Sequence, residues 1–191
     1  KRTHNALIEI LWTGIPVNES SSNDERIKSA MTRSSNYAIS QFESVKNYIK
    51  NLGVNKPIHI GETGWSSISS DNYGQNGTRA ADEYKQYLYY SNMIDYGKKN
   101  NISIFYFSAF DEPWKDFNNP NGSENHFGLF TVDGRAKYAM WKNLDKGLLN
   151  GLGRNGLEVS KTYRGKRKNM MIDVLTPNKK NKWRNWLFLR L

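Results

Sequence analysis

The sequence predicts an α/β domain with a parallel sheet, and the order of its segments is the main observation. Two short segments, residues 57–62 and 102–110, have the apolar pattern of strands. Segments whose apolar residues recur every three or four positions lie before, between and after these two strands. Strands that alternate with helices in this way form βαβ crossovers, which join parallel strands.

The amino-terminal part is predicted to contain a strand followed by a long amphipathic helix. Residues 6–12, Ala-Leu-Ile-Glu-Ile-Leu-Trp, suit a strand. The helix is indicated by apolar residues spaced four and three apart, namely Ala38, Phe42, Val45, Ile49 and Leu52. Gly53 follows this stripe, and glycine is common just past the end of a helix.

The next two elements are the strand at residues 57–62 and a helix after it. Ile58 and Ile60 share one face of the strand, and Pro57 stands at its first position, where a missing N–H is tolerated. The helix is indicated by residues spaced three and four apart, namely Ala81, Tyr84, Leu88, Ser91 and Ile94. Gly97 is predicted to end this helix in the left-handed conformation.

A further strand and a further helix complete the predicted pattern. Residues 102–110 form an almost continuous apolar and aromatic run, as expected for a strand buried on both faces of a parallel sheet. The helix is predicted to begin near residues 133–134. Its apolar residues have helical spacing, at Ala136, Met140 and Leu144.

The net charge of +10 is concentrated at the end of the chain. Residues 1–150 carry 17 Lys and Arg against 16 Asp and Glu, whereas residues 151–191 carry 11 against 2 and lack clear periodicity. We therefore expect residues 1–150 to form the domain and residues 151–191 to form a basic tail of uncertain order. A nearly neutral body does not favour nucleic-acid binding, so no nucleic-acid partner is expected.

Composition and motif searches argue against several classes of protein. No apolar run approaches the ~18 residues needed to cross a bilayer, so no membrane span is expected. The chain has no cysteine, which excludes disulfides and thiolate metal sites. No spacing of His, Asp and Glu suggests a metal site, and neither a Gly-rich phosphate loop nor a Gly-x-Ser-x-Gly elbow is present.

Two glutamates lie at the ends of the predicted strands, where the active site of a parallel α/β barrel lies. Glu62 ends the strand at residues 57–62, and Glu112 follows the last strand. Trp65 and Trp114 accompany them, and flat indole faces suit the apolar faces of sugar rings. Paired carboxylates beside such rings are typical of the active sites of glycoside hydrolases.

Each of these features also has an ordinary explanation. A single Glu at the end of a strand is most often a solvated loop residue. A single Trp more often packs in the core or at its rim, and Lys115 can belong to a surface ion pair.

Three motifs follow one another in order along residues 56–138. Residues 56–65 read Lys-Pro-Ile-His-Ile-Gly-Glu-Thr-Gly-Trp, and residues 105–115 read Phe-Tyr-Phe-Ser-Ala-Phe-Asp-Glu-Pro-Trp-Lys. Residues 122–130 read Gly-Ser-Glu-Asn-His-Phe-Gly-Leu-Phe and are followed by Asp-Gly-Arg-Ala-Lys-Tyr at 133–138. The first motif resembles the nucleophile motif of glycoside hydrolase family 17, the β-1,3-glucanase family. The second resembles the last barrel strand of its bacterial members.

The resemblance implies a (β/α)8 TIM barrel, of which this chain would hold the C-terminal portion, about three βα units, plus the basic tail. It implies that Glu62 is the nucleophile of a retaining mechanism that hydrolyses β-1,3-glucan. Glu112, Lys115 and Glu124 match charged residues around the acid/base region and the sugar hydroxyls. Three tryptophans would be sugar platforms, namely Trp65, Trp114 and, through a looser match of residues 12–16, Trp12.

The family's general acid/base is a glutamate on an earlier strand, and the matching region lies before Lys1. We therefore expect this chain to be a truncated product or part of an interrupted reading frame. Four functions stay open: a β-1,3-glucan hydrolase, a β-1,3-glucan transglycosylase in which a second sugar replaces water, a non-catalytic β-glucan-binding module, and a binder of nucleic acid or anionic surfaces that acts through the basic tail.

The expected partner is a β-1,3-glucan polysaccharide or oligosaccharide, and no cofactor is expected, because sugar transfer between carboxylates needs no redox chemistry. Polymeric glucan is met outside the cytoplasm, so an extracellular or cell-envelope setting is expected. The first residues of the chain show no signal-peptide pattern.

Overall fold

The computed structural model describes residues 22–68, 79–153 and 156–176. In chain order its helices and strands are α2 (Asn23–Asn51), β1 (Ile60–Thr63), α3 (Glu83–Asn100), β2 (Ile104–Tyr106), α4 (Tyr138–Asp145) and α5 (Arg167–Ile172). Two short 3-10 helices are also present, η2 (Ser123–Asn125) and η3 (Thr162–Gly165). The strand predicted at residues 6–12 lies outside the described residues.

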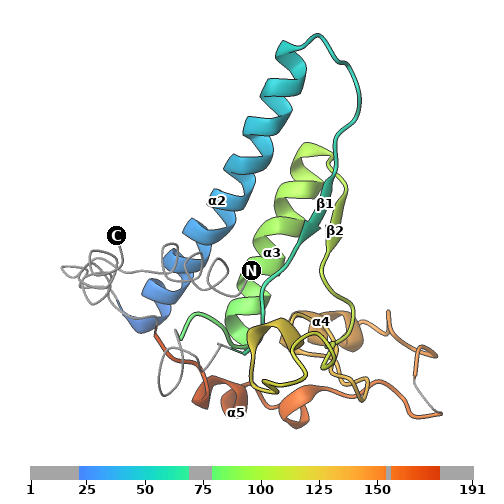
Figure 1. Ribbon diagram of the computed structural model, residues 1–191. Coiled ribbons are helices and arrows are strands. Elements are labelled where there is room, and N and C mark those ends of the chain that lie inside the picture. The colour runs from blue at the N-terminus through green and yellow to red at the C-terminus, as the bar shows by residue number, and fades with distance from the viewer. Residues whose placement is uncertain (1–21, 69–78, 154–155, 177–191) are drawn as a thin grey trace.

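The two strands are parallel neighbours, and α3 connects them. Figure 1 shows α3 lying between the strands on one side and α2 on the other. The predicted βαβ crossover is therefore confirmed. The second strand is shorter than predicted because the backbone leaves the sheet after β2: the amide of Ser108 donates to the carbonyl oxygen of Phe127 instead of to β1.

Helix α2 begins at a capping box. The Ser22 side chain accepts a hydrogen bond from the amide of Glu25, whose carboxylate accepts one from the amide of Ser22. The helix ends before Gly53, which has a φ of +74°, as predicted. Two of the five residues of the predicted apolar stripe are nevertheless exposed, since Val45 and Leu52 are 53% and 62% accessible. The reason is visible in Figure 1, where the second half of α2 reaches beyond α3.

Helix α3 begins at Asp82, whose side chain accepts a hydrogen bond from the amide of Lys85. It ends at Asn101, which has a φ of +53°, and not at Gly97 as predicted. Gly97 serves another purpose, because a Cβ there would lie 2.8 Å from Ile104 Cδ1 and 2.9 Å from the Ile102 carbonyl oxygen. This glycine allows the start of β2 to pack against the helix.

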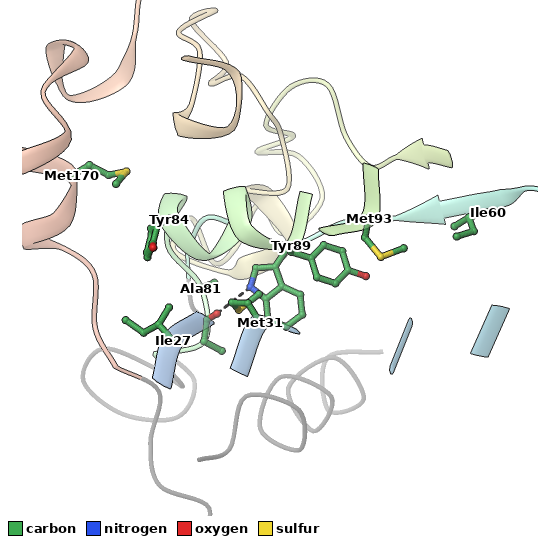
Figure 2. Close-up of a cluster of buried hydrophobic side chains, with 10 residues drawn as sticks. Ile27, Met31, Ile60, Ala81, Tyr84, Tyr89, Met93 and Met170 are labelled. Carbon is green, nitrogen blue, oxygen red and sulfur yellow. Dashed lines mark hydrogen bonds between the residues drawn. The ribbon is translucent and has the colours of Figure 1, made fainter. Parts of the chain in front are cut away.

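The main core lies between α2 and α3 and extends to β1 and α5. Figure 2 shows side chains of these four elements gathered around α3. The buried side chains include Ile27, Met31, Ile60, Tyr84, Tyr89, Met93 and Met170. Glu62 thus lies on a strand that packs against this core through Ile60.

Residues 156–176 pack against the rest of the domain. The amide of Ala136 donates to the Ser160 carbonyl oxygen at 2.7 Å, and the amide of Thr162 donates to the Ala136 carbonyl oxygen at 3.0 Å. Met170 of α5 is 1% exposed, and burial of such a side chain contributes about 1.5–3 kcal/mol. The predicted boundary at residue 150 therefore does not coincide with a break in packing. Within the described ranges, no helix is long and apolar enough to cross a membrane.

Candidate active site

A β-bulge lies in β1 beside the predicted nucleophile. The strands pair at Ile60 with Ile104 and at Thr63 with Tyr106. Between these two pairs β1 therefore contains one residue more than β2. The residue of β2 in this interval is Phe105, which is 63% exposed. Bulges change the direction of a side chain and are frequent next to active sites.

The bulge places Glu62 on the face of the sheet that points away from α3. Ile60 is buried, and Thr63 shares a hydrogen bond of 2.7 Å between its Oγ1 atom and the hydroxyl of Tyr89 on α3. Both residues therefore face α3. In the bulge, Gly61 and Glu62 together lie opposite the single residue Phe105, so the alternation counted back from Thr63 puts Glu62 on the other face. Gly61 and Glu62 are accordingly exposed.

The chain stays close to β2 after the last residue of β1. The amide of Phe107 donates a hydrogen bond of 2.8 Å to the carbonyl oxygen of Thr63. A Cβ on Gly64 would lie 2.0 Å from the carbonyl oxygen of Phe107, so only glycine fits at this position. The segment that follows Glu62 thereby contacts the beginning of the loop that carries Glu112.

Glu112 and Lys115 lie together in that loop. The Nζ atom of Lys115 lies 3.2 Å from Oε2 of Glu112 and 3.8 Å from the centroid of the Phe107 ring. The ammonium approaches Oε2 without the alignment of a hydrogen bond. This oxygen is inaccessible and has no hydrogen-bond partner among the described residues. The loop therefore places the carboxylate beside a cation that also contacts an aromatic ring.

Glu124 lies in η2, and the next residue connects it to Glu112. The carbonyl oxygen of Asn125 accepts a hydrogen bond of 3.0 Å from the amide of Glu112. The buried side chain of Asn125 accepts from the amide of Asp116 and donates to the carbonyl oxygens of Asp116 and Asn119. These bonds fold residues 111–126 into one loop. Glu124 thus precedes the residue whose main chain binds Glu112.

A buried lysine connects this loop to the segment after β1. The Nζ atom of Lys137 donates to Asp111 Oδ1 at 2.6 Å and to Ser67 Oγ at 2.7 Å, and it lies 3.4 Å from the His126 carbonyl oxygen. Lys137 is 2% exposed and Asp111 is 7% exposed. Burial lowers the pKa of Lys137, while the charge of Asp111 acts in the opposite direction. The ammonium therefore joins the loops that follow both strands.

A second connection comes from Gln86 of α3. Its Nε2 atom donates to the carbonyl oxygens of Trp65, Phe127 and Gly128 at 3.0, 3.2 and 2.9 Å. Reasoning from the sequence missed both Gln86 and Lys137. The signal for Gln86 was a polar residue on the buried side of a helix. The signal for Lys137 was its place within the third motif.

The three predicted platforms differ in their positions. Trp65 is 6% exposed, its indole N–H donates to the Ala80 carbonyl oxygen at 3.0 Å, and its ring lies 5.1 Å from that of Tyr89. It is a core residue, and this contradicts the prediction that it is an exposed sugar platform. Trp114 is 66% exposed in the loop between Glu112 and Lys115. Trp12 lies outside the described residues.

An apolar cavity lies apart from these residues. Its volume is about 190 Å³, and none of the predicted site residues line it. The lining residues are Phe110, Phe130, Gly134, Leu149, Leu152 and Val159. In the part of the chain that the structure describes, no three His, Cys, Asp or Glu side chains gather where they could hold a metal ion.

Comparison with known families identifies the class of protein. The sequence model of glycosyl hydrolases family 17 matches residues 27–141, which is more than half of the chain. The chain therefore belongs to glycoside hydrolase family 17, and the resemblance noted in the three motifs is confirmed.

Individual relatives point in the same direction. The crystal structure of an endo-laminarinase from Formosa Hel1_33_131 has a TM-score of 0.84 and 48% identity, over 93% of this chain and 46% of that chain. A glucan 1,3-beta-glucosidase of Arthroderma benhamiae is 38% identical over 88 residues, which are 42% of this chain and 27% of the relative. The acidic isoform PR-O of a Nicotiana tabacum glucan endo-1,3-beta-glucosidase is 34% identical over 99 residues, 46% of this chain and 54% of the relative. The chain thus spans between about a quarter and about half of the length of these proteins.

Proposed function

We propose that this chain is the C-terminal portion, about three βα units, of a (β/α)8 barrel that hydrolyses β-1,3-glucan with retention. The position of Glu62 carries the proposal: it stands at the carboxyl end of β1, on the exposed face, beside the loop that holds Glu112 and Lys115. The carboxyl ends of parallel barrel strands are where catalytic residues lie. The names of the relatives, an endo-laminarinase and glucan 1,3-beta-glucosidases, support the same substrate.

The chemistry assigned to Glu62 is nucleophilic. Its carboxylate attacks the anomeric carbon, the bond from that carbon to the leaving sugar oxygen breaks, and a glycosyl ester forms. A second carboxyl group protonates the leaving oxygen and then accepts a proton from the water that hydrolyses the ester. Glu112 and Lys115 would bind sugar hydroxyls, and the exposed ring of Trp114 would support a sugar face. A β-1,3-glucan substrate places this activity outside the cytoplasm, at the cell envelope or beyond it.

The proposal is tested by trapping the glycosyl-enzyme on the chain itself. The probe is 2-deoxy-2-fluoro-β-laminaribiosyl fluoride, because its fluoride leaves without protonation and the 2-fluorine slows hydrolysis of the ester. The reaction therefore depends on the nucleophile and not on the general acid. We expect the intact mass to increase by one 2-fluorodisaccharide, and peptide mapping to place this adduct on Glu62.

Two controls define the result. The variant Glu112→Gln should still be labelled at Glu62, and the corresponding β-1,4-linked fluoride should label the chain much more slowly. An adduct on Glu112 would contradict the proposal. A folded chain that binds β-1,3-oligosaccharides without forming an adduct would also contradict it and would favour a glucan-binding module. Products longer than the starting oligosaccharide would indicate transglycosylation in place of hydrolysis.

A further inference from the structure

We propose that Lys137 is a positioning residue of the active site, whose ammonium holds the segment after Glu62 against the loop that carries Glu112. Its catalytic consequence rests on the proposed function, whereas its structural effect is independent of it. Lys137 lies at the start of α4, and its hydrogen bonds go to neither Glu62 nor Glu112. It acts through its hydrogen-bond partners.

The partners of Lys137 lie close in sequence to the two glutamates. Asp111 immediately precedes Glu112, and Ser67 lies five residues after Glu62. The ammonium binds both, at 2.6 Å and 2.7 Å. An ammonium group has three N–H donors in a compact head, so one Lys side chain can satisfy acceptors on several segments at once. One cation therefore contacts both loops, which are also joined by Gln86 and by a hydrogen bond of 2.9 Å from Ser66 Oγ to the carbonyl oxygen of Ser123.

The third contact completes the connection. The carbonyl oxygen of His126 lies 3.4 Å from Nζ of Lys137, and the same oxygen accepts a hydrogen bond of 2.9 Å from the amide of Ser67. The amide of Gly128 donates to Asp111 Oδ1 at 3.0 Å. Removal of the ammonium would leave the buried carboxylate of Asp111 with the amide of Gly128 and the imidazole of His126, whose Nδ1 lies 3.8 Å from Oδ2. Loss of the lysine partner of a buried carboxylate is strongly unfavourable. The loops are then expected to separate so that water can reach that carboxylate.

A second buried lysine provides a matched control. Lys85 is 0% exposed, its Nζ atom contacts the carboxylate of Asp82, and it donates to the carbonyl oxygen of Leu175 at 2.6 Å. It therefore has the same chemistry and the same burial as Lys137. Its partners, however, lie at the start of α3 and near the end of the described chain, not in the loops that follow the strands. Loss of either lysine removes a buried ion pair, but only loss of Lys137 changes the site.

The structural test is hydrogen exchange measured by mass spectrometry on Lys137→Met and Lys85→Met. For Lys137→Met we expect exchange to become at least about tenfold faster in peptides from residues 64–68 and 111–128, with peptides of α2 unchanged. For Lys85→Met the increase should fall at residues 82–86 and 170–176. If Lys137→Met does not fold, the double variant Asp111→Asn with Lys137→Met also removes the orphaned negative charge, and it should show the same local increase. Unchanged exchange at residues 64–68 and 111–128 in a folded variant would overturn the proposal.

The catalytic test uses the labelling of Glu62 by the glycosyl fluoride. Lys137→Met should lower the rate constant of labelling by about 10- to 100-fold, since small displacements of catalytic groups have effects of this size. The dissociation constant of the probe should change less than about threefold, and Lys85→Met should leave both parameters near those of the unchanged chain. Equal effects of the two lysines would show a general loss of stability and overturn the positioning role. If the unchanged chain is not labelled at all, the proposed function fails, and the exchange experiment alone decides whether Lys137 positions the loops.

Discussion

The carbonyl oxygen of Thr63 accepts a hydrogen bond of 2.8 Å from the amide of Phe107, which joins the residue after Glu62 to the end of β2. Gly64 follows Thr63 and lies against the main chain of Phe107. The orientation of Glu62 therefore depends on contact between two backbones. A backbone contact can be tested with substitutions that add a single methyl group.

Gly64→Ala should destabilise the chain. The added Cβ would lie 2.0 Å from the carbonyl oxygen of Phe107, and a backbone atom cannot move aside as the end of a side chain can. Overpacking of this kind costs about 1–3 kcal/mol. The free energy of unfolding, measured by urea denaturation, should fall by this amount.

Gly61→Ala is the matched control for this prediction. Gly61 lies three residues earlier, and a Cβ there would meet no atom within 4 Å. Its effect on the free energy of unfolding should stay within about 0.5 kcal/mol, as for most surface substitutions. Equal losses in the two variants would show that the contact with Phe107 is not the cause.

Glu62→Gln should abolish formation of the glycosyl ester and preserve binding. An amide has the shape of the carboxylate but cannot form the glycosyl ester, so fluoride release from an unmodified laminaribiosyl fluoride should fall by at least ~10³-fold. The dissociation constant for laminari-oligosaccharides, measured by calorimetry, should change little. A variant that keeps most of the fluoride release would refute the assignment of Glu62 as nucleophile.

Substitution by alanine should affect binding at Trp114 and stability at Trp65. Trp114 is 66% exposed, so Trp114→Ala should weaken oligosaccharide binding and leave the urea midpoint nearly unchanged. Trp65 is buried and donates a hydrogen bond to Ala80, so Trp65→Ala should cost about 3–5 kcal/mol of stability. Calorimetry and urea denaturation on both variants separate the two effects. Unchanged binding in Trp114→Ala would remove this residue from the proposed sugar site.

The sequence was sufficient to predict the parallel crossover and the end of α2 because both depend on local signals. Apolar spacing indicates helices, and Gly53 adopts the left-handed conformation that favours glycine. The end of α3 was predicted at Gly97, where the requirement for glycine comes instead from packing against Ile104. The sequence does not distinguish a glycine that is required for a left-handed conformation from one that is required for close packing.

The remaining errors concern which surface is covered. Val45 fits the apolar stripe of α2 but is exposed, and Trp65 lies in the catalytic motif but is buried. Periodicity shows which face of an element is apolar and not whether another element covers it. The link from Lys137 to Ser67 joins residues 70 positions apart, and no local pattern reports such a contact. The packing of residues 156–176 was missed for a similar reason, because backbone bonds to Ala136 hold that segment.

The pH dependence of stability should reveal the buried carboxyl of Glu83. Its Oε2 atom accepts hydrogen bonds from the amide of Tyr138 at 2.8 Å and the hydroxyl of Thr162 at 2.7 Å, and burial raises its pKa above the ordinary value of 4.5. Above pH 4.5 the unfolded chain releases this proton while the native state retains it until its own, higher pKa. The native state then binds more protons, so this group's contribution to stability is complete below pH 4.5 and is lost as the pH rises.

Glu83→Gln removes that titration and keeps an oxygen that can accept both hydrogen bonds. The stability of Glu83→Gln relative to the unchanged chain should therefore increase as the pH rises from 4.5 towards neutrality, by up to about 1.4 kcal/mol per pH unit while the native carboxyl stays protonated. Urea midpoints measured at intervals between pH 4.5 and 7.5 give this difference. Glu43→Gln supplies a control, because a hydrogen bond from Tyr96 lowers the pKa of Glu43. Its contribution is lost only as the pH falls through and below 4.5, so the stability difference for Glu43→Gln should not increase between pH 4.5 and 7.5. A difference for Glu83→Gln that is constant across the range, or that decreases with pH, would show that the buried carboxyl titrates normally.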